Sequence, residues 1–373
     1  MVGLMETLLP SPRILLGPGP SSVTPRVLEA LGRAPIGYLD PELFALLDGL
    51  RSDLRALFGT KNEFTIPLTG TGMAGMECSL VNLIEPGDNV VIGINGFFGG
   101  RMAEISRRLG AVVTEVHAEW GQPIEPVKFY EALSTLSTVK LVGCVHAETS
   151  TGVRQPIESI AAIAHDRGAL FLVDAVTSLG GIPVNIDECD VDVCYSGTQK
   201  CVGAPPGLSP LSVSDAAWKV YTQRKNQVPN WYYDWQLLRN YYDAPHTYHH
   251  TVPVNLLFAL REALVEIHEE GLDTRYRRHH EVSAQLLTGL AKFGIVPFAN
   301  SDYRLPTLNA VLIPDSVADE IVVRKRLLLE YGLEIGGGLG ALKGKVWRIG
   351  TMGASATRRN VTLLLAALEQ IMT

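Results

Sequence analysis

The sequence predicts an α/β fold in which a mainly parallel sheet lies between helices, followed by a smaller C-terminal α+β domain. Between about residues 62 and 213, short apolar runs alternate with longer amphipathic stretches; the runs are FTIPLTG, NVVIGI, AVVTEVHA, KLVGCVHA, ALFLVDAV and VDVCYSG. Strands buried on both faces have this nearly continuous apolar character, and the segments between them carry helical spacing. Such alternation builds a parallel sheet whose ligands bind at the carboxyl ends of the strands.

The segments on either side of this region differ in character. Residues 1–22, which contain Pro10, Pro12, Pro18 and Pro20, are expected to form an extended arm. A long helical stretch is expected from about 254 to 293 with a break near Gly271, followed by strands near 309–313 and 346–350 and helices near 317–331 and 356–372. We therefore expect a large domain over residues 23–270 and a small domain over residues 271–373.

Composition and charge narrow the class of ligand. The chain has 373 residues, of which 39 are acidic and 32 basic, so its formal net charge is −7. Because the chain contains no long basic cluster, we do not expect it to bind nucleic acid or a membrane surface. We expect a small molecule as its ligand. The five cysteines include no C-x-x-C pair and lie mostly within apolar runs, which predicts buried, reduced thiols. No targeting or membrane-spanning segment is visible, so we expect a cytoplasmic location.

A glycine-rich motif follows the first apolar run and opens a helical stretch. The residues Gly70-Thr71-Gly72-Met73-Ala74-Gly75 match G-x-G-x-x-G, which is typical of dinucleotide sites. A dinucleotide site also needs an acidic residue at the end of the next strand, where this chain has Asn95. We therefore prefer an anion site, in which backbone amides and the Thr71 hydroxyl surround a phosphate, over a turn that serves packing alone.

Two ionisable residues follow later strand runs. Asp174 ends the run FLVD, where a buried carboxylate needs a cationic or strongly donating partner; taken alone it is more typical of a helix cap. Lys200 follows the run VDVCY within an apolar setting that would lower its pKa and make it a nucleophilic amine, although an isolated loop lysine is more often solvated.

Together the three features indicate one cofactor. A phosphate cradle, a carboxylate and a reactive lysine after successive strands are what pyridoxal phosphate requires, because it needs an anchor, a partner for its ring nitrogen and a Schiff-base amine. Asp174 and Lys200 are far enough apart in the sequence for a further strand to lie between them.

Beyond these residues, the sequence closely resembles the alanine:glyoxylate and serine:pyruvate aminotransferases, which are class V, fold type I pyridoxal-phosphate enzymes. The likeness extends over nearly the whole chain, through LLGPGPSSVTPRVLEAL, LTGTGMAGMECSLVNLIEPGD, GINGFFGGR, VHAETSTGVRQP, LVDAVTSLGG, YSGTQKCVGAPPG, YHHTVPVNLLFALREAL and GGGLGALKGKVWRIGTMG. It implies a fold type I aminotransferase with a homodimeric assembly.

The resemblance also implies roles for individual residues. Lys200 looks like the Schiff-base lysine and proton carrier, and Asp174 like the partner of the pyridine nitrogen. The remaining positions that match cofactor contacts are Thr71, Gly72 and Gln199 at the phosphate, Thr149 at the phenolic oxygen, and Val176 and Phe98 on the two ring faces. Two positions depart from the family pattern, since Phe98 replaces a frequent Trp and Met73 replaces a His found in some relatives.

Three further residues are implied to act at the substrate or across a dimer. Arg348 lies where family members bind the substrate carboxylate, which a planar guanidinium can grip with two hydrogen bonds, although by itself it resembles a strand-end surface arginine. Tyr248 and Thr251, in YHHT, lie where the family reaches the phosphate of the neighbouring subunit. The adjacent His249 and His250 are not expected to bind a metal.

The implied function is transfer of the amino group of L-alanine or L-serine to glyoxylate or pyruvate, in two half-reactions through Lys200. Within the same fold, a kynurenine or hydroxykynurenine transaminase, a kynureninase-like lyase or a cysteine desulfurase are alternatives; a desulfurase needs a mobile cysteine in the later part of the chain, and none follows Cys201. A nicotinamide-dependent oxidoreductase that uses the Gly70 motif is the alternative from another class, and a non-catalytic scaffold is a remote one.

Overall fold

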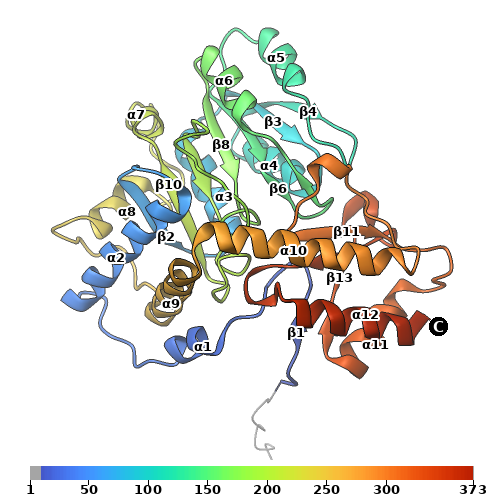
Figure 1. Cartoon of the computed structure of the whole chain (residues 1–373). Coiled ribbons are helices and arrows are strands. Elements are labelled where there is room, and N and C mark those ends of the chain that lie inside the picture. The colour runs from blue at the N-terminus through green and yellow to red at the C-terminus, as the bar shows by residue number, and fades with distance from the viewer. Residues whose placement is uncertain (1–9, 373) are drawn as a thin grey trace, which may run out of the picture.

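A seven-stranded sheet forms the centre of the larger part of the computed structural model, which describes residues 10–372 (Figure 1). Its strands are β2 (Phe64–Thr69), β3 (Asn89–Ile94), β4 (Val112–His117), β5 (Leu141–Val145), β8 (Leu170–Asp174), β9 (Val193–Tyr195) and β10 (Leu208–Val213). Their order is β2-β10-β9-β8-β5-β3-β4, and the neighbouring pairs from β9 to β4 are parallel. The predicted α/β class with a mainly parallel sheet is therefore confirmed.

Strand β10 is the one strand of this sheet that the sequence pattern does not predict. It runs antiparallel to both β2 and β9. Its sequence, LSPLSV, contains Ser209, Pro210 and Ser212, so it lacks the continuous apolar run of the other strands, although every one of its residues is buried. The hydroxyls of Ser209 and Ser212 instead bond to neighbouring strands and loops, which satisfies them inside the core.

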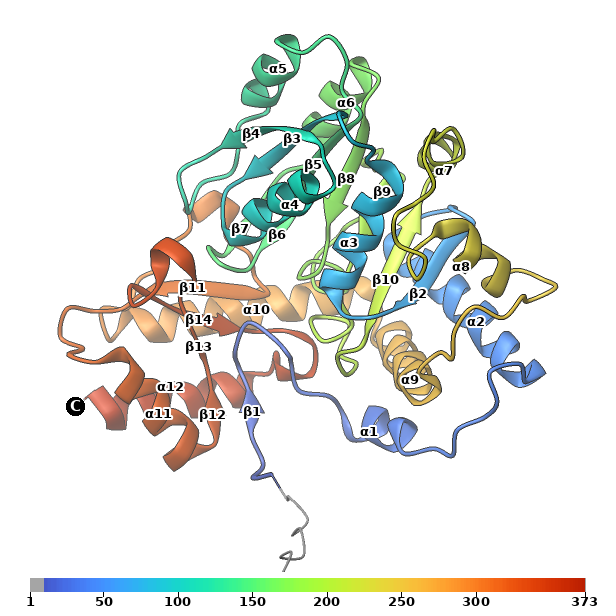
Figure 2. The ribbon, with the colours of Figure 1, turned by 180° about the vertical axis from the view of Figure 1, so that it is seen from behind.

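Helices cover both faces of this sheet, as the two opposite views show (Figures 1 and 2). They are α2 (Pro41–Phe58), α3 (Gly72–Leu83), α4 (Phe97–Arg108), α5 (Pro126–Ser134), α6 (Glu158–Asp166), α7 (Asp215–Thr222), α8 (Trp235–Tyr242) and α9 (Val254–Glu270), with α1 (Pro25–Leu31) packed beside α9. Strands β2, β3, β5, β8 and β9 run in the same direction, so the residues that follow them meet at one edge of the sheet.

The C-terminal part of the chain contains a smaller antiparallel sheet with helices packed against it. Its strands are β11 (Leu308–Leu312), β14 (Val346–Gly350) and β13 (Gly336–Gly337), in that order. The helices are α10 (Leu272–Ala291), α11 (Glu320–Tyr331) and α12 (Arg358–Met372). Two short pairs complete the fold, β1 (Ile14–Leu15) with β12 (Leu333–Glu334) and β6 (Ala147–Glu148) with β7 (Val153–Arg154).

The buried apolar residues form separate clusters. One extends from Val27 to Ile267 around the large sheet, and another joins Leu16 to residues between Val282 and Leu368. Between them, α9 ends and α10 begins at Gly271, whose φ of +76° is unfavourable for residues with a side chain. We therefore propose a domain boundary near residue 271. Of the expected arm, residues 1–9 lie outside the described part of the chain.

Candidate active site

The glycine-rich motif places the start of α3 at the edge of the sheet. Thr71 is the N-cap of α3, and its side chain makes no capping hydrogen bond, so the hydroxyl is available to a ligand. Gly70 has φ +129°, and a Cβ there would lie 2.3 Å from Ala74 Cβ. A Cβ on Gly72 would lie 2.8 Å from Val176 Cγ2. The first amides of a helix lack intrahelical acceptors, so this close-packed turn presents free N–H groups to an anion.

Asp174 ends β8 and is buried, with 3% of its surface exposed. Its Oδ1 accepts a hydrogen bond from Val176 N at 2.8 Å, and its Oδ2 accepts one from the Tyr195 hydroxyl at 2.8 Å. Burial raises the pKa of Asp174 to about 6, against which these two donors act. The carboxylate is therefore held by strong donors and forms no ion pair among residues 10–372, which leaves it suited to a cationic group on a ligand.

Lys200 lies in the turn after β9, with its amine directed at the N-terminal segment. Its Nζ donates a hydrogen bond to Pro18 O. Gly19, with φ +115°, passes so close that a Cβ there would lie 2.4 Å from Lys200 Nζ. Burial, and then the charge of Arg348, lower the pKa of Lys200 to about 8. A solvated surface lysine does not fit this position, and at neutral to mildly basic pH part of the population is an uncharged, nucleophilic amine.

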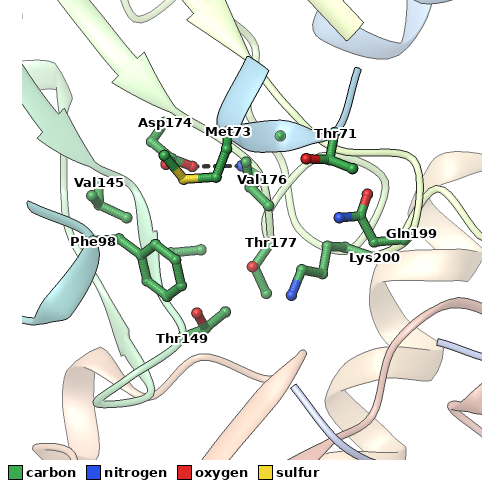
Figure 3. Close-up of a pocket in the computed structure, with 12 residues that line it drawn as sticks. Thr71, Met73, Phe98, Val145, Thr149, Asp174, Val176, Thr177, Gln199 and Lys200 are labelled. Atoms are coloured by element: carbon green, nitrogen blue, oxygen red, sulfur yellow. Dashed lines mark hydrogen bonds between the residues drawn. The ribbon is translucent and has the colours of Figure 1, made fainter. Parts of the chain in front are cut away.

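One pocket brings together most of the residues singled out from the sequence (Figure 3). It is lined by Thr71, Gly72, Met73, Phe98, Thr149, Asp174, Val176, Gln199 and Lys200, together with Val145, Ala147 and Thr177, which the sequence analysis did not single out. Figure 3 shows Lys200 pointing into the pocket from the side of Gln199, with Phe98 and Thr149 across from it. Gln199 Oε1 is buried without a hydrogen-bond partner within residues 10–372, so this acceptor is available to a donor group of a ligand.

The wall formed by Phe98 is stabilised by an arginine. Phe98 lies at the start of α4, and the Arg101 guanidinium is 5.6 Å from its ring centroid and 4.8 Å from that of Phe97. Arg101 Nη1 also contacts Met73 Sδ at 3.5 Å. The two departures from the family pattern, at Phe98 and Met73, thus share one cationic neighbour, which limits the movement of both side chains.

A buried glutamate supports the same wall and was not singled out from the sequence. Glu148 is fully buried, and its Oε2 accepts from the backbone amides of Phe98 and Gly99 at 3.0 and 3.4 Å. Its Oε1 accepts from Ser150 N and Oγ at 3.0 and 2.6 Å. It therefore fixes the first turn of α4 against the loop that carries Thr149. The motif HAETSTG contains it, but only the fold shows that its partner is a distant helix terminus.

Arg348 lies in β14 with 8% of its surface exposed, so the interpretation as a surface arginine is wrong. Its Nε donates to Gly337 O at 2.7 Å, which fixes the plane of the guanidinium. Burial lowers the pKa of Arg348 to about 10, so the group is still charged at neutral pH. Arg348 does not line the pocket described above, yet it is close enough for its charge to lower the pKa of Lys200.

Tyr248 and Thr251 lie outside the pocket of their own chain. Tyr248 is 54% exposed, with its ring centroid 4.8 Å from that of Tyr38, and Thr251 is also exposed. Between them, His249 Nδ1 and His250 Nδ1 are 2.7 Å apart, and His250 Nε2 lies 2.9 Å from Thr69 Oγ1. Within residues 10–372 no group of three or more His, Cys, Asp or Glu side chains is arranged to hold a metal ion.

The donor set fits an anionic aromatic cofactor with a reactive carbonyl. The start of α3 offers amides and the Thr71 hydroxyl for a phosphate, and Gln199, whose side-chain NH2 group is a donor, lines the same pocket. Val176 and Phe98 both line the pocket and offer apolar surfaces that suit a ring. Asp174 at one end suits a protonated ring nitrogen, and Lys200 at the other suits an aldehyde.

Comparison with known proteins identifies the family. The model of the class-V aminotransferases matches residues 34–340. The chain is 40% identical to alanine–glyoxylate aminotransferase from Oryctolagus cuniculus over 98% of this chain and 94% of the relative. The structure of alanine–glyoxylate aminotransferase from Nostoc sp. superposes with a TM-score of 0.97 and 44% identity, covering 99% of this chain and 98% of that one. The structure of ureidoglycine–glyoxylate aminotransferase from Bacillus subtilis superposes with a TM-score of 0.96 and 37% identity, covering 98% of this chain and 94% of that one.

The chain belongs to the class-V aminotransferase family. It has the fold type I architecture of these enzymes, as its sheet order and its match to their structures show. The protein is therefore an aminotransferase, and the resemblance inferred from the sequence motifs is confirmed.

Proposed function

We propose that this aminotransferase uses pyridoxal phosphate to move the amino group of L-alanine or L-serine to glyoxylate or pyruvate. The observation that carries the proposal is the convergence of the Lys200 amine, the Asp174 carboxylate and the start of α3 in one pocket, with Arg348 nearby. The names of the relatives add to it, because the alanine–glyoxylate and ureidoglycine–glyoxylate enzymes share glyoxylate. Glyoxylate is thus the best supported acceptor.

Pyridoxal phosphate, when bound, supplies an aldehyde that links to amines and a ring that withdraws electrons from the carbon bearing the amino group. Thr71, Gly72 and Gln199 would hold its phosphate, and Val176 and Phe98 would enclose its ring. Met73 would pack beside the phosphate cradle, and Thr149 would donate to the phenolic oxygen. Asp174, kept in place by Tyr195 and Val176, would keep the ring nitrogen protonated.

Lys200 has two roles in this proposal. Its Nζ would be the amine to which the aldehyde of the bound cofactor attaches at rest, and it would be set free when the donor's amino group takes its place. The free Nζ would then accept the proton from the donor Cα and hold it for return in the second half of the transfer. The lowered pKa of Lys200, about 8, suits a group that must be neutral to accept a proton and charged to give one back.

Arg348 would bind the carboxylate that donor and acceptor share. With Nε bonded to Gly337 O, the two terminal nitrogens of the guanidinium would grip the carboxylate. Because alanine, serine, glyoxylate and pyruvate all carry this group, one arginine serves both half-reactions. A buried guanidinium keeps its orientation as substrates exchange.

A homodimer with shared active sites is part of the proposal. Tyr248 is 54% and Trp231 59% exposed, together with Tyr38 and Leu39 at 41% and 50%. Large exposed aromatic and aliphatic side chains of this kind are typical of a protein interface. A partner chain that covers them would bring its Tyr248 and Thr251 to the phosphate site.

Among residues 10–372, none of the helices has the length and apolar character that a membrane-spanning segment needs.

The five cysteines bear on location and on the desulfurase alternative. None forms a disulfide; Cys78, Cys144, Cys194 and Cys201 are buried, while Cys189 is only partly buried, in contrast to the expectation of buried thiols. Free thiols suit a reducing compartment, and we propose a cytoplasmic location. Cys201 bonds to Thr177 O, and burial raises its pKa to about 12, so it is no mobile nucleophile of the kind that a desulfurase requires.

The first test is the visible spectrum of the purified protein with pyridoxal phosphate. A yellow band should appear, fall on addition of L-alanine or L-serine, and recover with glyoxylate. (S)-Ureidoglycine, the donor named for the Bacillus subtilis relative, belongs in the same series. A yellow protein that no donor bleaches would refute the proposed donors. A protein that binds no pyridoxal phosphate would refute the proposed role of Lys200 and, with it, the proposed function.

The second test replaces the lysine itself. Lys200→Ala should abolish turnover while the phosphate and ring contacts retain the cofactor, since Thr71, Gly72, Val176 and Phe98 are unchanged. Retained cofactor is measured by absorbance after gel filtration and turnover by release of pyruvate from alanine. Normal turnover in this variant would exclude the proposed role of Lys200.

A further inference from the structure

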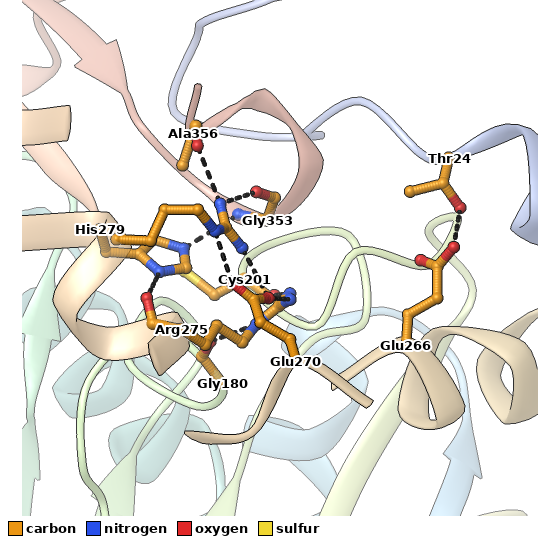
Figure 4. Close-up of polar contacts among 10 residues, drawn as sticks. Thr24, Gly180, Cys201, Glu266, Glu270, Arg275, His279, Gly353 and Ala356 are labelled. Carbon is orange, nitrogen blue, oxygen red and sulfur yellow. Dashed lines mark hydrogen bonds and ion pairs between the residues drawn. The ribbon is translucent and has the colours of Figure 1, made fainter. Parts of the chain in front are cut away.

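Arg275 is a buried arginine in the first turn of α10, shortly after Gly271, which separates α9 from α10 (Figure 4). Only 6% of its surface is exposed, and its guanidinium has three different partners. Nε donates to Gly180 O at 2.9 Å, Nη2 donates to Cys201 O at 2.6 Å, and Nη1 pairs with Glu270 Oε2 at 2.7 Å. A buried cation is costly unless it is paired in this way.

The two carbonyls held by Arg275 belong to the two loops that carry the reactive residues. Cys201 is the next residue after Lys200, and Gly180 lies in the loop that follows Asp174. These loops touch each other directly, because a Cβ on Gly180 would lie 3.5 Å from Cys201 O. A rigid, planar guanidinium bound to both carbonyls fixes the distance between the loops, which a flexible ammonium cannot do with the same precision of geometry.

Glu270 neutralises this arginine and links it to a second one. Its Oε1 accepts from Arg278 Nε at 2.6 Å and its Oε2 from Arg278 Nη2 at 2.9 Å, besides the bond from Arg275. Burial alone would raise the pKa of Glu270, but the hydrogen bonds and charges of the two arginines lower it to about 2. The carboxylate is therefore ionised at every pH at which the enzyme works.

Arg278 and His279 extend the contacts to the strand that carries Arg348. Arg278 Nη1 donates to Gly353 O and Ala356 O at 2.9 and 2.8 Å, in the turn that follows β14. His279 is fully buried; burial lowers its pKa to about 3, so the ring is neutral. Its Nδ1–H donates to Arg275 O at 2.7 Å, and its Nε2 accepts from Gly353 N at 3.1 Å.

We propose that Arg275 is a positioning residue for transamination, which holds Lys200 in register with Asp174 and, through Glu270, Arg278 and His279, with the strand of Arg348. The inference rests on the function proposed above. It follows from one guanidinium that joins the Asp174 loop to the Lys200 loop, while Glu270, Arg278 and His279 join Arg275 to the turn that follows β14. Arg275 touches neither the pocket nor a substrate, so it acts only through the groups it holds.

The decisive variant is Arg275→Lys, which keeps the charge beside Glu270 but cannot hold both carbonyls and the carboxylate. Because small displacements of a proton-transfer group lower the rate steeply, kcat for alanine and glyoxylate should fall about 10- to 100-fold. KM for alanine should change less than about 3-fold, since Arg348 is untouched. The pH dependence of kcat should shift, because the surroundings of Lys200 change, and bound cofactor should dissociate several-fold faster.

Arg277→Lys is the matched control, since Arg277 lies on the same turn of α10 and is exposed. Rates are expressed per cofactor-loaded site, so that a loss of folded protein does not count as a loss of catalysis. If Arg275→Lys matches the Arg277→Lys control in kcat, pH profile and cofactor dissociation, Arg275 serves stability only and the proposal is refuted. An equal fall in folded fraction and total activity, with normal rates per site, refutes it too.

Glu270→Gln provides the test if Arg275→Lys does not fold. It keeps the shape of the carboxylate but weakens both arginine pairs, and we expect the same pattern with a smaller fall in kcat, about 3- to 10-fold. A Glu270→Gln enzyme with unchanged kcat, pH profile and cofactor dissociation would overturn the proposal. Failure of the proposed function is recognised separately, because the wild-type protein would then fail to bind pyridoxal phosphate or to convert alanine.

Discussion

Asp174 and Tyr195 lie opposite each other on the neighbouring parallel strands β8 and β9, and the Tyr195 hydroxyl donates a hydrogen bond of 2.8 Å to Asp174 Oδ2. Both residues are buried, and the second carboxylate oxygen is occupied by Val176 N. The bond therefore orients the carboxylate as well as stabilising its charge. In the proposed mechanism Tyr195 acts on the ring nitrogen of the cofactor through Asp174, without any contact of its own with the pocket.

Tyr195→Phe should lower kcat about 5- to 10-fold, because one hydrogen bond to a buried carboxylate contributes about 1 kcal/mol. KM for alanine should hardly change, since Arg348 still binds the substrate. Steady-state kinetics of the cofactor-loaded variant measure both. Tyr221→Phe is the control, because Tyr221 donates a bond of 2.7 Å to Asp234 away from the pocket. Equal kinetics in the two variants would exclude a role for the Tyr195–Asp174 bond.

Lys200, which is partly buried, should make the stability of the cofactor-free protein depend on pH. The pKa of Lys200 is about 8 in the folded chain and near 10.5 in the unfolded one, so the unfolded state binds more protons between these values. The free energy of unfolding should therefore rise with pH across this window, by about 2 kcal/mol, and the contribution of Lys200 is least favourable below pH 8.

Urea denaturation of cofactor-free protein at a series of pH values from 7.5 to 10.5 measures this dependence. Lys200→Met should be more stable than wild type at the lower end and should lose the rise attributed to the lysine. The same slope in wild type and Lys200→Met would show that Lys200 titrates normally in the folded chain.

Arg348→Lys should impair substrate binding more than the chemical step. Lysine keeps the positive charge but cannot give two parallel hydrogen bonds while also bonding to Gly337 O. KM for alanine and for glyoxylate should both rise about 10- to 100-fold, while kcat falls less. Arg326→Lys, in the exposed Arg326–Glu330 pair of α11, is the control. A change in kcat with KM constant would place Arg348 elsewhere than on the substrate carboxylate.

Site residues at the ends of strand runs could be predicted from the sequence, whereas residues placed by contacts between distant segments could not. Asp174 ends a strand run, and Thr71 and Lys200 lie in the turns that follow strand runs. Parallel strands bring such positions to one edge of the sheet, so their convergence could be predicted. Tyr195 and Glu148 could not be singled out in this way. An aromatic residue within an apolar run is typical of the core, and only the β8–β9 register places the Tyr195 hydroxyl on Asp174.

Contacts between the two parts of the chain were harder still to predict. Arg275 lies in a helix with ordinary amphipathic spacing, and nothing local distinguishes it from Arg277 or Arg278. Its partners Gly180 and Cys201 are far away in sequence and are backbone carbonyls, which carry no residue-specific signal. Strand β10 cannot be predicted for a related reason, because the hydroxyls of its serines form hydrogen bonds with segments that only the assembled sheet brings close.

The shared active site can be tested by mixing two inactive variants. In the proposed homodimer each site uses Lys200 of one subunit and Tyr248 and Thr251 of the other. A dimer formed by one Lys200→Ala subunit and one subunit with Tyr248→Ala and Thr251→Ala would then contain one intact site and one with both defects. Tyr248 and Thr251 are exposed, so their replacement should leave the fold of the subunit intact.

Random exchange of equal amounts of the two variants makes half of the dimers mixed, each with one of its two sites intact. The mixture should therefore recover about a quarter of the wild-type activity, although each variant alone is nearly inactive. Different affinity tags on the two chains, with purification through both, establish that exchange has occurred and should enrich the activity of the mixed dimers to about half. Purified mixed dimers no more active than the parents would show that Tyr248 and Thr251 do not complete the neighbouring site.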